Sequence, residues 1–374
     1  MIMSEDNPYA SDKARKDTRM VVAMSGGVDS STVAALMKDQ GYEVIGMTLQ
    51  LYDHGQALQK KGACCAGGDI HDAAMVCSKL DIPHYVLNYE SRFKESVMDD
   101  FADSYMKGLT PVPCVTCNQT VKFTDMLAAA KDLDADVLVT GHYVSKKTGD
   151  EGVELHKGFD EGKDQSYFMF ATTKEQLEFI DFPLGQLTKD KTREMALHYG
   201  LEVADKPDSQ DICFVPQGDY ASVVQKLRPE AYDPGDIVHV DGTVLGRHEG
   251  IIKYTRGQRR GLGIAYSDPL YVVRVEPETR QVIVGGEEDL YQNRFYVKNV
   301  NWLAKPFTAC ETRHLSMRLR STHSGVKGKV TRLEGNMFEV VLDEPERAIT
   351  PGQACVFYDG TRVLGGGWIC QEGV

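Results

Sequence analysis

MVVAMSGGVDSS, at residues 20–31, is the stretch that decides the fold. Its first five residues form a short apolar run that predicts a buried strand, and the strand is broken by Ser25-Gly26-Gly27. A helix is expected to follow over residues 30–40, and a second strand over residues 42–49. A strand, a helix and a strand at this spacing predict a right-handed βαβ unit and therefore a parallel sheet.

The same alternation continues as far as about residue 205. The apolar periodicity predicts further helices over residues 69–81, 90–107, 119–132 and 188–199, and further strands over residues 84–87 and 135–140. We therefore expect residues 18–205 to form an α/β domain around a doubly wound parallel sheet.

The composition and the hydrophobic pattern of the sequence change after residue 205. Prolines cluster at 207, 216, 229 and 234, and short alternating segments such as YVVRV and FEVVLDE follow. Such segments are typical of small β-barrels. We expect a central β-rich domain over residues 206–290, a β-barrel over residues 291–374, and a flexible tail over residues 1–17.

Composition places the chain among globular proteins. It has 374 residues, of which 42% are hydrophobic and 26% charged. No apolar run approaches the roughly 18 residues that a membrane helix needs. The first twenty residues are polar and lack the apolar core of a secretory signal, so a cytoplasmic protein with no membrane contact is predicted. The nine cysteines are an odd number without a signal, which favours reduced thiols over a disulfide framework.

The net charge of −13 is unevenly distributed. Lys and Arg slightly outnumber Asp and Glu over residues 236–374, so the acidity belongs to residues 1–235. Residues 312–333 carry basic side chains and no acid, and a second basic cluster spans residues 253–260. Because phosphates respond to local charge, these two stretches are candidates for contact with nucleic acid, although a solvated surface is an equally good interpretation.

The glycine loop predicts an anion site. Glycines let the backbone approach a ligand closely, and the first N–H groups of the following helix would point at a phosphate. Ser25, Ser30 and Ser31 add hydroxyl groups, whereas Asp29 would repel a phosphate and is expected to hold Mg²⁺ or the loop itself. The string matches neither GxxxxGK[ST] nor GxGxxG, so this is a different type of phosphate loop.

Two cysteines are candidate nucleophiles. Cys117 is expected just before the helix over residues 119–132, where a thiol is more readily deprotonated, and Cys213 lies in the string DSQDICF at residues 208–214. Cys77, Cys310, Cys355 and Cys370 are expected to be small buried side chains. Cys114 and Cys117 form a CxxC pair, but no second pair exists, so no metal site is predicted.

These motifs carry a resemblance to known enzymes. SGGVDS resembles the pyrophosphatase loop (PP-loop) of ATP-dependent enzymes that adenylate an oxygen and release pyrophosphate. Over nearly its full length the chain resembles the bacterial tRNA-specific 2-thiouridylase family. The matching strings, besides residues 23–31, are CNQTVKF at 117–123, TGHY at 140–143, KDQSYF at 163–168, DSQDICF at 208–214, GQRRGLG at 257–263 and TPGQ at 350–353.

The resemblance implies a role for each matched residue. Cys117 would be the nucleophile and Cys213 the carrier of a persulfide sulfur. ATP, with Mg²⁺, would be held by Ala23, Met24, Ser25, Gly26, Gly27, Val28, Asp29, Ser30, Leu49 and Gly141. Transfer RNA would be contacted by His142, Lys163, Asp164, Gln165, Arg320, Ser321 and Gln353.

The resemblance also implies the reaction. C2 of the wobble uridine in tRNAs for Lys, Glu and Gln would be thiolated through an adenylated uridine, giving 2-thiouridine, AMP and pyrophosphate. A cysteine desulfurase or a sulfur relay protein would supply the sulfur, and a Cys117–Cys213 disulfide would form. The family often has Asn-Pro-Asp at the segment that contacts the target base, whereas this chain has Val112, Pro113 and Cys114. The carboxylate is absent here.

Two other classes of function remain as alternatives. One is an ATP-dependent ligase of small molecules, although the β-rich second half would then have no evident task. The other is an RNA-binding protein without catalysis, whose glycine loop has lost its use. Release of pyrophosphate with a small acceptor and no tRNA would favour the ligase. Tight ATP binding that is lost in Asp29→Ala, with RNA binding retained, would count against the RNA-binding protein.

Overall fold

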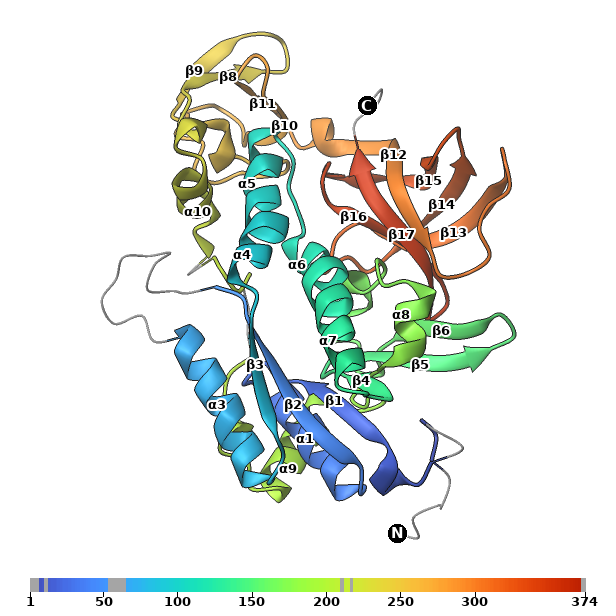
Figure 1. Cartoon of the computed structure of the whole chain (residues 1–374). Coiled ribbons are helices and arrows are strands. Elements are labelled where there is room, and N and C mark those ends of the chain that lie inside the picture. The colour runs from blue at the N-terminus through green and yellow to red at the C-terminus, as the bar shows by residue number, and fades with distance from the viewer. Residues whose placement is uncertain (1–6, 10–12, 53–64, 209–211, 216–217, 371–374) are drawn as a thin grey trace. The chain divides into compact units, whose positions relative to one another are not determined.

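The computed structural model describes residues 7–9, 13–52, 65–208, 212–215 and 218–370. The chain, coloured from its N-terminus to its C-terminus in Figure 1, divides into two compact units. The first unit comprises residues 1–94, 116–210 and 361–363, and the second comprises residues 95–115, 211–360 and 364–374. In the part of the chain that is described, no helix is both long and apolar enough to cross a membrane.

The first unit is built on a five-stranded sheet in the order β3-β2-β1-β4-β7. Every neighbouring pair is parallel, which confirms the doubly wound α/β prediction. Met20, Val21 and Val22 are fully buried because both faces of the sheet are covered. The strands are β1 (Arg19–Ala23), β2 (Glu43–Gln50), β3 (His84–Asn88), β4 (Val137–Val139) and β7 (Ile180–Asp181).

One face of this sheet packs against α1 (Val28–Asp39), α3 (Cys65–Lys79) and α9 (Lys189–His198). Met20 and Val22 of β1 share a core with side chains from all three helices, such as Val33, Ala73 and Ala196. On the other face, α7 (Leu127–Asp132) contacts β4 and continues the π-helical segment η3 (Asn118–Met126). These helices fall where the apolar periodicity predicts them.

Several elements of the first unit have no counterpart in the sequence prediction, among them β7, the edge strand of the sheet. A hairpin joins β5 (Val144–Gly149) to β6 (Gly152–Lys157), and residues 361–363 lie beside β6 through Arg362 and His156. A short helix, α8 (Lys174–Phe179), begins at a capping box formed by Thr173 and Gln176. Short segments of mixed polarity carry little periodicity, which explains why these elements were missed.

Other helical segments differ from prediction in their bounds. Residues 90–106 divide into α4 (Glu90–Phe93), the π-helical η2 (Lys94–Met98) and α5 (Asp99–Met106). The helix predicted from residue 119 begins earlier, because α6 (Pro113–Cys117) precedes η3. A proline in the first turn lacks only an N–H that would have no helical partner there, so Pro113 starts this helix rather than preventing it.

The second unit contains two β structures. One is a four-stranded sheet in the order β10-β11-β8-β9, whose core includes the buried side chains of Ile237, Val272 and Val282. In the same unit, helix α10 (Tyr220–Leu227) packs against α5. Its strands are β8 (Gly235–His239), β9 (Val244–His248), β10 (Tyr271–Glu276) and β11 (Gln281–Gly285).

The C-terminal strands form an antiparallel barrel in the order β12-β15-β14-β13-β16-β17, closed by pairing of β12 with β17. Trp302, Phe338 and Phe357 pack ring against ring in its core. The strands are β12 (Tyr291–Trp302), β13 (Thr312–Arg318), β14 (Val326–Arg332), β15 (Met337–Arg347), β16 (Ala354–Asp359) and β17 (Arg362–Cys370). The predicted barrel is confirmed, whereas the exact domain boundaries and the flexible tail stay predictions.

Candidate active site at the glycine loop

The glycine loop leaves the carboxyl end of β1 and enters α1 at once. Gly26 has a φ of +72°, and a Cβ atom built there would lie 2.1 Å from the backbone oxygen of Asp69. Gly27 is the N-cap of α1 with an ordinary φ of −93°. Only Gly26 therefore needs to be glycine for both its backbone angle and its surroundings.

Hydroxyl groups close the loop. The Ser30 Oγ accepts a hydrogen bond from the Ser25 N–H at 3.1 Å and lies 3.2 Å from the Ser25 Oγ. Gly141, just past β4, approaches the first turn of α1 so closely that a Cβ atom would lie 2.9 Å from the Ser30 nitrogen. Leu49 lies half-buried near the carboxyl end of β2. The predicted ATP residues thus gather at one edge of the sheet, where ligands bind in open α/β folds.

Asp29 is held by a buried lysine. The Lys189 Nζ donates to both Asp29 carboxylate oxygens, at 2.7 and 2.8 Å, and its side chain is only 9% exposed. The Tyr143 hydroxyl lies 2.9 Å from the same carboxylate. Of the two roles expected for Asp29, this arrangement favours fixing the loop over binding a metal, because the carboxylate already has strong partners.

Lys189 also joins the loop to Asp208. Its Nζ lies 2.8 Å from Asp208 Oδ1, and the same carboxylate receives Lys163 at 2.7 Å and Arg193 at 3.0 Å. Burial alone would raise the pKa of Asp208, but the hydrogen bonds and charges of Lys163 and Lys189 outweigh it and hold the pKa at about 2. Asp208 directly precedes residues 209–211, which lie outside the described part of the chain.

This pKa predicts how stability depends on pH. A carboxylate whose pKa is lowered in the folded state stabilises the fold above its unfolded pKa of about 3.9, and loses that contribution as pH falls through the folded value. We expect the difference in unfolding free energy between wild type and Asp208→Asn to shrink as pH falls from about 4 to about 2. Urea unfolding at a series of pH values measures it, and a constant difference would contradict the assignment.

A second lysine fixes the outer side of the loop. The Lys206 Nζ donates to the Gly26 carbonyl oxygen at 2.9 Å, to Asp69 at 2.7 Å and to Asp72 at 2.6 Å. Because Asp69 and Asp72 lie on α3, this lysine ties the loop to that helix. Sequence reasoning gave no role to Lys189, Lys206, Arg193 or Tyr143. The available hints were that Tyr143 ends the string TGHY and that Asp208 opens the string noted for Cys213.

The two candidate nucleophiles differ in exposure. Cys117 is buried, at 6% exposed, and is the last residue of α6, directly before η3 begins at Asn118. A helical element does follow Cys117 as expected, but α6 runs directly into η3, so the thiol lies within a helical run and not at its N-terminus. Cys213 is exposed, as is Cys114 in the first turn of α6, whereas Val112 and Pro113 are buried. Cys77, Cys355 and Cys370 are buried as expected, but Cys310 is exposed.

The residues expected to contact tRNA in the first unit already have partners within it. The Asp164 carboxylate accepts hydrogen bonds from the Gly158 N–H at 3.0 Å and the Ser166 hydroxyl at 2.9 Å, and Gln165 accepts one from the Tyr143 N–H at 2.8 Å. These two side chains shape the loop that carries Lys163.

His142 is a neutral side chain in this environment. Its Nδ1 lies 2.9 Å from the Thr140 hydroxyl, and its ring packs near Phe123. Burial, together with the charge of Lys122, lowers its pKa to about 3. Any contact that His142 makes with RNA would therefore use its ring or a hydrogen bond, not a positive charge.

In the second unit, Arg320 and Ser321 are exposed in the turn after β13, and Gln353 donates to the Thr110 carbonyl oxygen at 3.0 Å.

The basic stretch 312–333 is less positive than its sequence indicates. Arg313 pairs with Glu311 at 2.6 Å, and Arg320 approaches Glu346 of β15 at 3.5 Å. Lys327 and Lys329 of β14 remain exposed.

Fold and site together define a class. A glycine loop between the first strand and first helix of a parallel sheet, its aspartate fixed by a buried lysine, is a nucleotide-binding α/β architecture, here combined with two β structures. Matches to protein-family models divide the chain into the same three parts. Residues 18–217 match "tRNA methyl transferase HUP domain", residues 221–286 match "tRNA methyl transferase PRC-barrel domain", and residues 292–369 match "Aminomethyltransferase beta-barrel domain".

Full-length relatives narrow the class. The chain is 59% identical to a tRNA-specific 2-thiouridylase MnmA of Rickettsia bellii over 96% of its own length and 97% of the relative's. It is 60% identical to one of a Ruegeria species over 96% and 95%. The chain belongs to the tRNA-specific 2-thiouridylase family. A solved 4-thiouridine synthetase–RNA complex with bound ATP covers 57% of this chain and 51% of its own, at 14% identity and a TM-score of 0.33, too loose a likeness to carry weight.

Proposed function

We propose that this protein is an ATP-dependent tRNA sulfurtransferase that converts the wobble uridine of tRNAs for Lys, Glu and Gln to 2-thiouridine. The observation that carries the proposal is the glycine loop fixed by Lys189 and Lys206, in a chain 59% identical over nearly its whole length to relatives named for this activity.

ATP would bind with its phosphates at the loop and at the first turn of α1. The backbone N–H groups and the dipole of the helix favour negative charge there. Adenylation of the uridine O2 turns a poor leaving group into AMP, and pyrophosphate leaves from the loop. Both oxygens of Asp29 are hydrogen-bonded to Lys189, so Mg²⁺ is proposed only as the counter-ion that ATP brings, and none of the steps depends on it.

Sulfur transfer would use the two candidate cysteines. A donor protein, either a cysteine desulfurase or a sulfur relay protein, passes one sulfur to the Cys213 thiolate to give a persulfide. The terminal sulfur attacks C2 of the adenylated uridine and displaces AMP. The Cys117 thiolate then attacks the Cys213 sulfur and breaks the S–S bond to the transferred atom. A Cys117–Cys213 disulfide and 2-thiouridine result, and a dithiol reductant restores both thiols.

Burial defines the proposed contact with the target base. Because Val112 and Pro113 are buried and Cys114 is exposed, only Cys114 of this segment presents its side chain to solvent. We propose that it takes the place of the family's usual carboxylate as a neighbour of the base. A neutral thiol is a weak hydrogen-bond donor and does not accept a proton as a carboxylate does, so Cys114 has no proposed part in proton or sulfur transfer.

The proposed partner is tRNA, whose single-stranded anticodon loop lets the base leave its stack at low cost. The exposed Arg320, Ser321, Lys327 and Lys329 are the proposed backbone contacts of the second unit, and Lys163 is that of the first. Reopening a disulfide in each turnover requires a reducing compartment, so we propose that the enzyme acts in the cytoplasm.

The decisive experiment separates adenylation from sulfur transfer. Cys213→Ala and Cys117→Ala are each expected to lower 2-thiouridine formation by at least about 100-fold, because each removes one sulfur of the proposed relay. Both variants should still adenylate the uridine and release pyrophosphate when tRNA is present, whereas Cys213→Ala should leave AMP bonded to the uridine because no persulfide displaces it. Mass spectrometry of tRNA after incubation with ATP and a persulfide donor measures 2-thiouridine formation. Release of labelled pyrophosphate measures adenylation.

Cys310→Ala is the matched control, because Cys310 is also exposed and has no proposed role. Full thiolation by either of the first two variants would refute the relay. Formation of AMP without any tRNA, on a small-molecule acceptor, would instead favour a ligase.

A further inference from the structure

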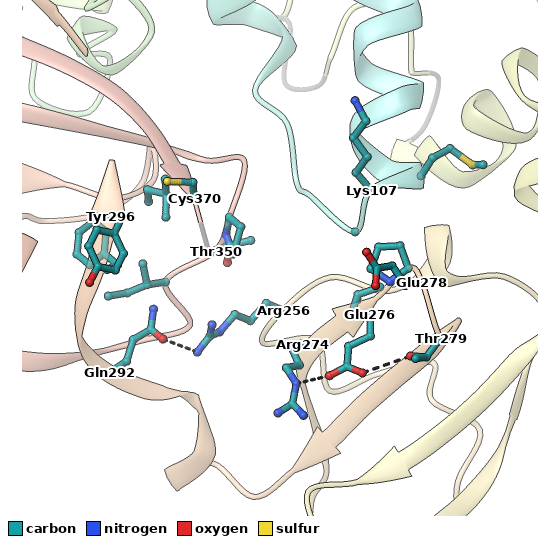
Figure 2. A pocket seen from close by; sticks show the side chains of 18 of the residues that line it. Lys107, Arg256, Arg274, Glu276, Glu278, Thr279, Gln292, Tyr296, Thr350 and Cys370 are labelled. Atoms are coloured by element: carbon teal, nitrogen blue, oxygen red, sulfur yellow. Dashed lines mark hydrogen bonds and ion pairs between the residues drawn. The ribbon is translucent and has the colours of Figure 1, made fainter. Parts of the chain in front are cut away.

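The second unit contains a cavity of about 860 Å³ that the proposed reaction does not use. Its walls come from the end of α5, from β10 with the turn after it, from β12, and from the last residues of β17 (Figure 2). Cavities of about 300–1,000 Å³ are the size that encloses small organic ligands.

Arg256 is the unusual side chain in this cavity. Its NH2 donates to the Gln292 Oε1 at 3.2 Å, and its Nε is buried with no hydrogen-bond partner among the described residues. No carboxylate in the described part of the chain lies within ion-pair distance of it. Burial, and then the charge of Arg274, lower the pKa of Arg256 from its ordinary value, which shows that its positive charge is poorly compensated.

The other arginines of the cavity are compensated. Arg274 donates to Glu276 at 2.7 Å, and Arg294 pairs with Glu339 of β15. Figure 2 shows Arg256 beside Gln292 in the cavity, with Arg274 and Glu276 on one side and Tyr296 on the other. A partly buried cation without a counter-charge is unfavourable, and a bound anion removes that cost.

The remaining walls suit a larger group than an inorganic anion. Ile349 and Ile369 are buried and apolar, at 1% and 2% exposed, and Tyr296 offers an aromatic ring. Nucleobases bind to such surfaces by stacking on aromatic rings and excluding water. We propose that this cavity binds one nucleotide, with its phosphate on Arg256 and Gln292 and its base beside Tyr296.

The nucleotide has two possible sources with the same chemistry: a unit of the tRNA chain away from the target uridine, or a free nucleotide. The first source rests on the proposed function and the second does not. From the sequence, the whole cluster 253–260 is a candidate for contact with phosphates, with a solvated surface as the equal alternative. Of its members Lys253 pairs with Glu249, whereas Arg259 and Arg260 are exposed, so Arg256 alone has the character of a built site.

The test compares Arg256→Gln with Arg247→Gln in the full chain. Arg247 lies on β9 outside the cavity, with a side chain 75% exposed, so its variant controls for the loss of one charge. Uridine monophosphate and inorganic phosphate are titrated calorimetrically, and tRNA binding is measured at several salt concentrations. We expect Arg256→Gln to weaken binding of uridine monophosphate by about ten-fold or more, because one charge-assisted contact is lost.

A tRNA source predicts in addition that Arg256→Gln weakens tRNA binding several-fold and lowers the salt slope by about one, while Arg247→Gln does not. Weakened binding of uridine monophosphate with unchanged tRNA affinity assigns the cavity to a free nucleotide. Unchanged binding of both overturns the proposal. If inorganic phosphate binds as tightly as uridine monophosphate, the proposed contact between the base and Tyr296 is overturned. In that case Tyr296→Leu should not change the affinity for uridine monophosphate.

Two further measurements separate nucleotide binding by Arg256 from a role in stability, and separate the nucleotide site from the proposed function. The melting temperature of ligand-free Arg256→Gln should be no lower than that of Arg247→Gln, because the replacement removes an uncompensated charge. A clear drop would show that Arg256 supports the fold instead, and would overturn the proposal. Wild type that binds uridine monophosphate through Arg256 but neither binds nor thiolates tRNA would refute the proposed function and leave the nucleotide site standing.

Discussion

Lys189→Met is expected to abolish formation of AMP and to lower the free energy of unfolding by about 2–3 kcal/mol, near the lower end of the range for breaking a buried ion pair. The lysine is 9% exposed and bridges Asp29 of the glycine loop to Asp208. Without it, two carboxylates face each other in a partly buried space and Asp29 loses its fixed position. The loop would then meet the phosphates of ATP with an uncompensated negative charge.

Lys191→Met is the matched control, because Lys191 lies on the same helix but is exposed, and among the described residues its ion pair is with Glu194. It should change stability by no more than about 0.5 kcal/mol. Urea unfolding and tRNA-dependent release of pyrophosphate measure the two effects. Wild-type activity in Lys189→Met would show that Asp29 needs no fixed orientation.

A second substitution separates stability from positioning. If the instability of Lys189→Met comes from unpaired carboxylates, adding Asp208→Asn should restore part of the unfolding free energy, because it removes one of the two charges. The double variant should remain inactive, since Asp29 is still not held. Recovery of activity in the double variant would mean that charge alone, and not the geometry of Asp29, controls the loop.

The glycine loop could be predicted from the sequence because it is local. Residues 20–31 contain the strand, the turn and the start of the helix, and the positive φ at Gly26 is a property that only glycine adopts easily. The parallel sheet follows once residues 32–49 are added, since a strand, helix and strand in succession leave few possible connections.

The cluster around Lys189 could not be predicted in this way. Asp29 and Lys189 are 160 positions apart, and Lys206 reaches Gly26 over 180 positions. No pattern in the sequence links them, because each lysine lies in a segment that looks like an ordinary solvated helix or loop. Only the fold brings the ends of these segments to the carboxyl edge of β1.

The basic stretch 312–333 shows the same limit for charge. The sequence counts no acid within it, yet β15 pairs with β14 along the barrel and places Glu339 and Glu346 on a neighbouring strand. A count of charged residues within one segment of the sequence omits the acidic side chains that a neighbouring strand of the sheet places beside it. Cys117 illustrates a local limit instead, because the helical run expected from residue 119 begins at Pro113, and a proline suits the first turn of a helix.

Gly26→Ala is the other substitution with a large expected effect. The φ of +72° alone costs an alanine about 1–3 kcal/mol. The added Cβ would lie 2.1 Å from the Asp69 oxygen, a backbone atom that cannot move aside without shifting α3. We expect the loop to be displaced from α1, so that affinity for ATP falls by at least about ten-fold, the equivalent of one lost charge-assisted hydrogen bond. Calorimetric titration with a non-hydrolysable ATP analogue measures it.

Gly27→Ala is the control one residue away. Its φ of −93° suits any residue, and its Cβ would lie 3.5 Å from the Ser25 Oγ, which is ordinary contact. The cost should be no more than about 1 kcal/mol, because alanine is only a poorer N-cap than glycine. The two variants add the same methyl group to adjacent loop residues, so a difference in ATP affinity can come only from backbone angle and from contact with α3. Equal loss in both would mean instead that ATP requires the space above the loop itself.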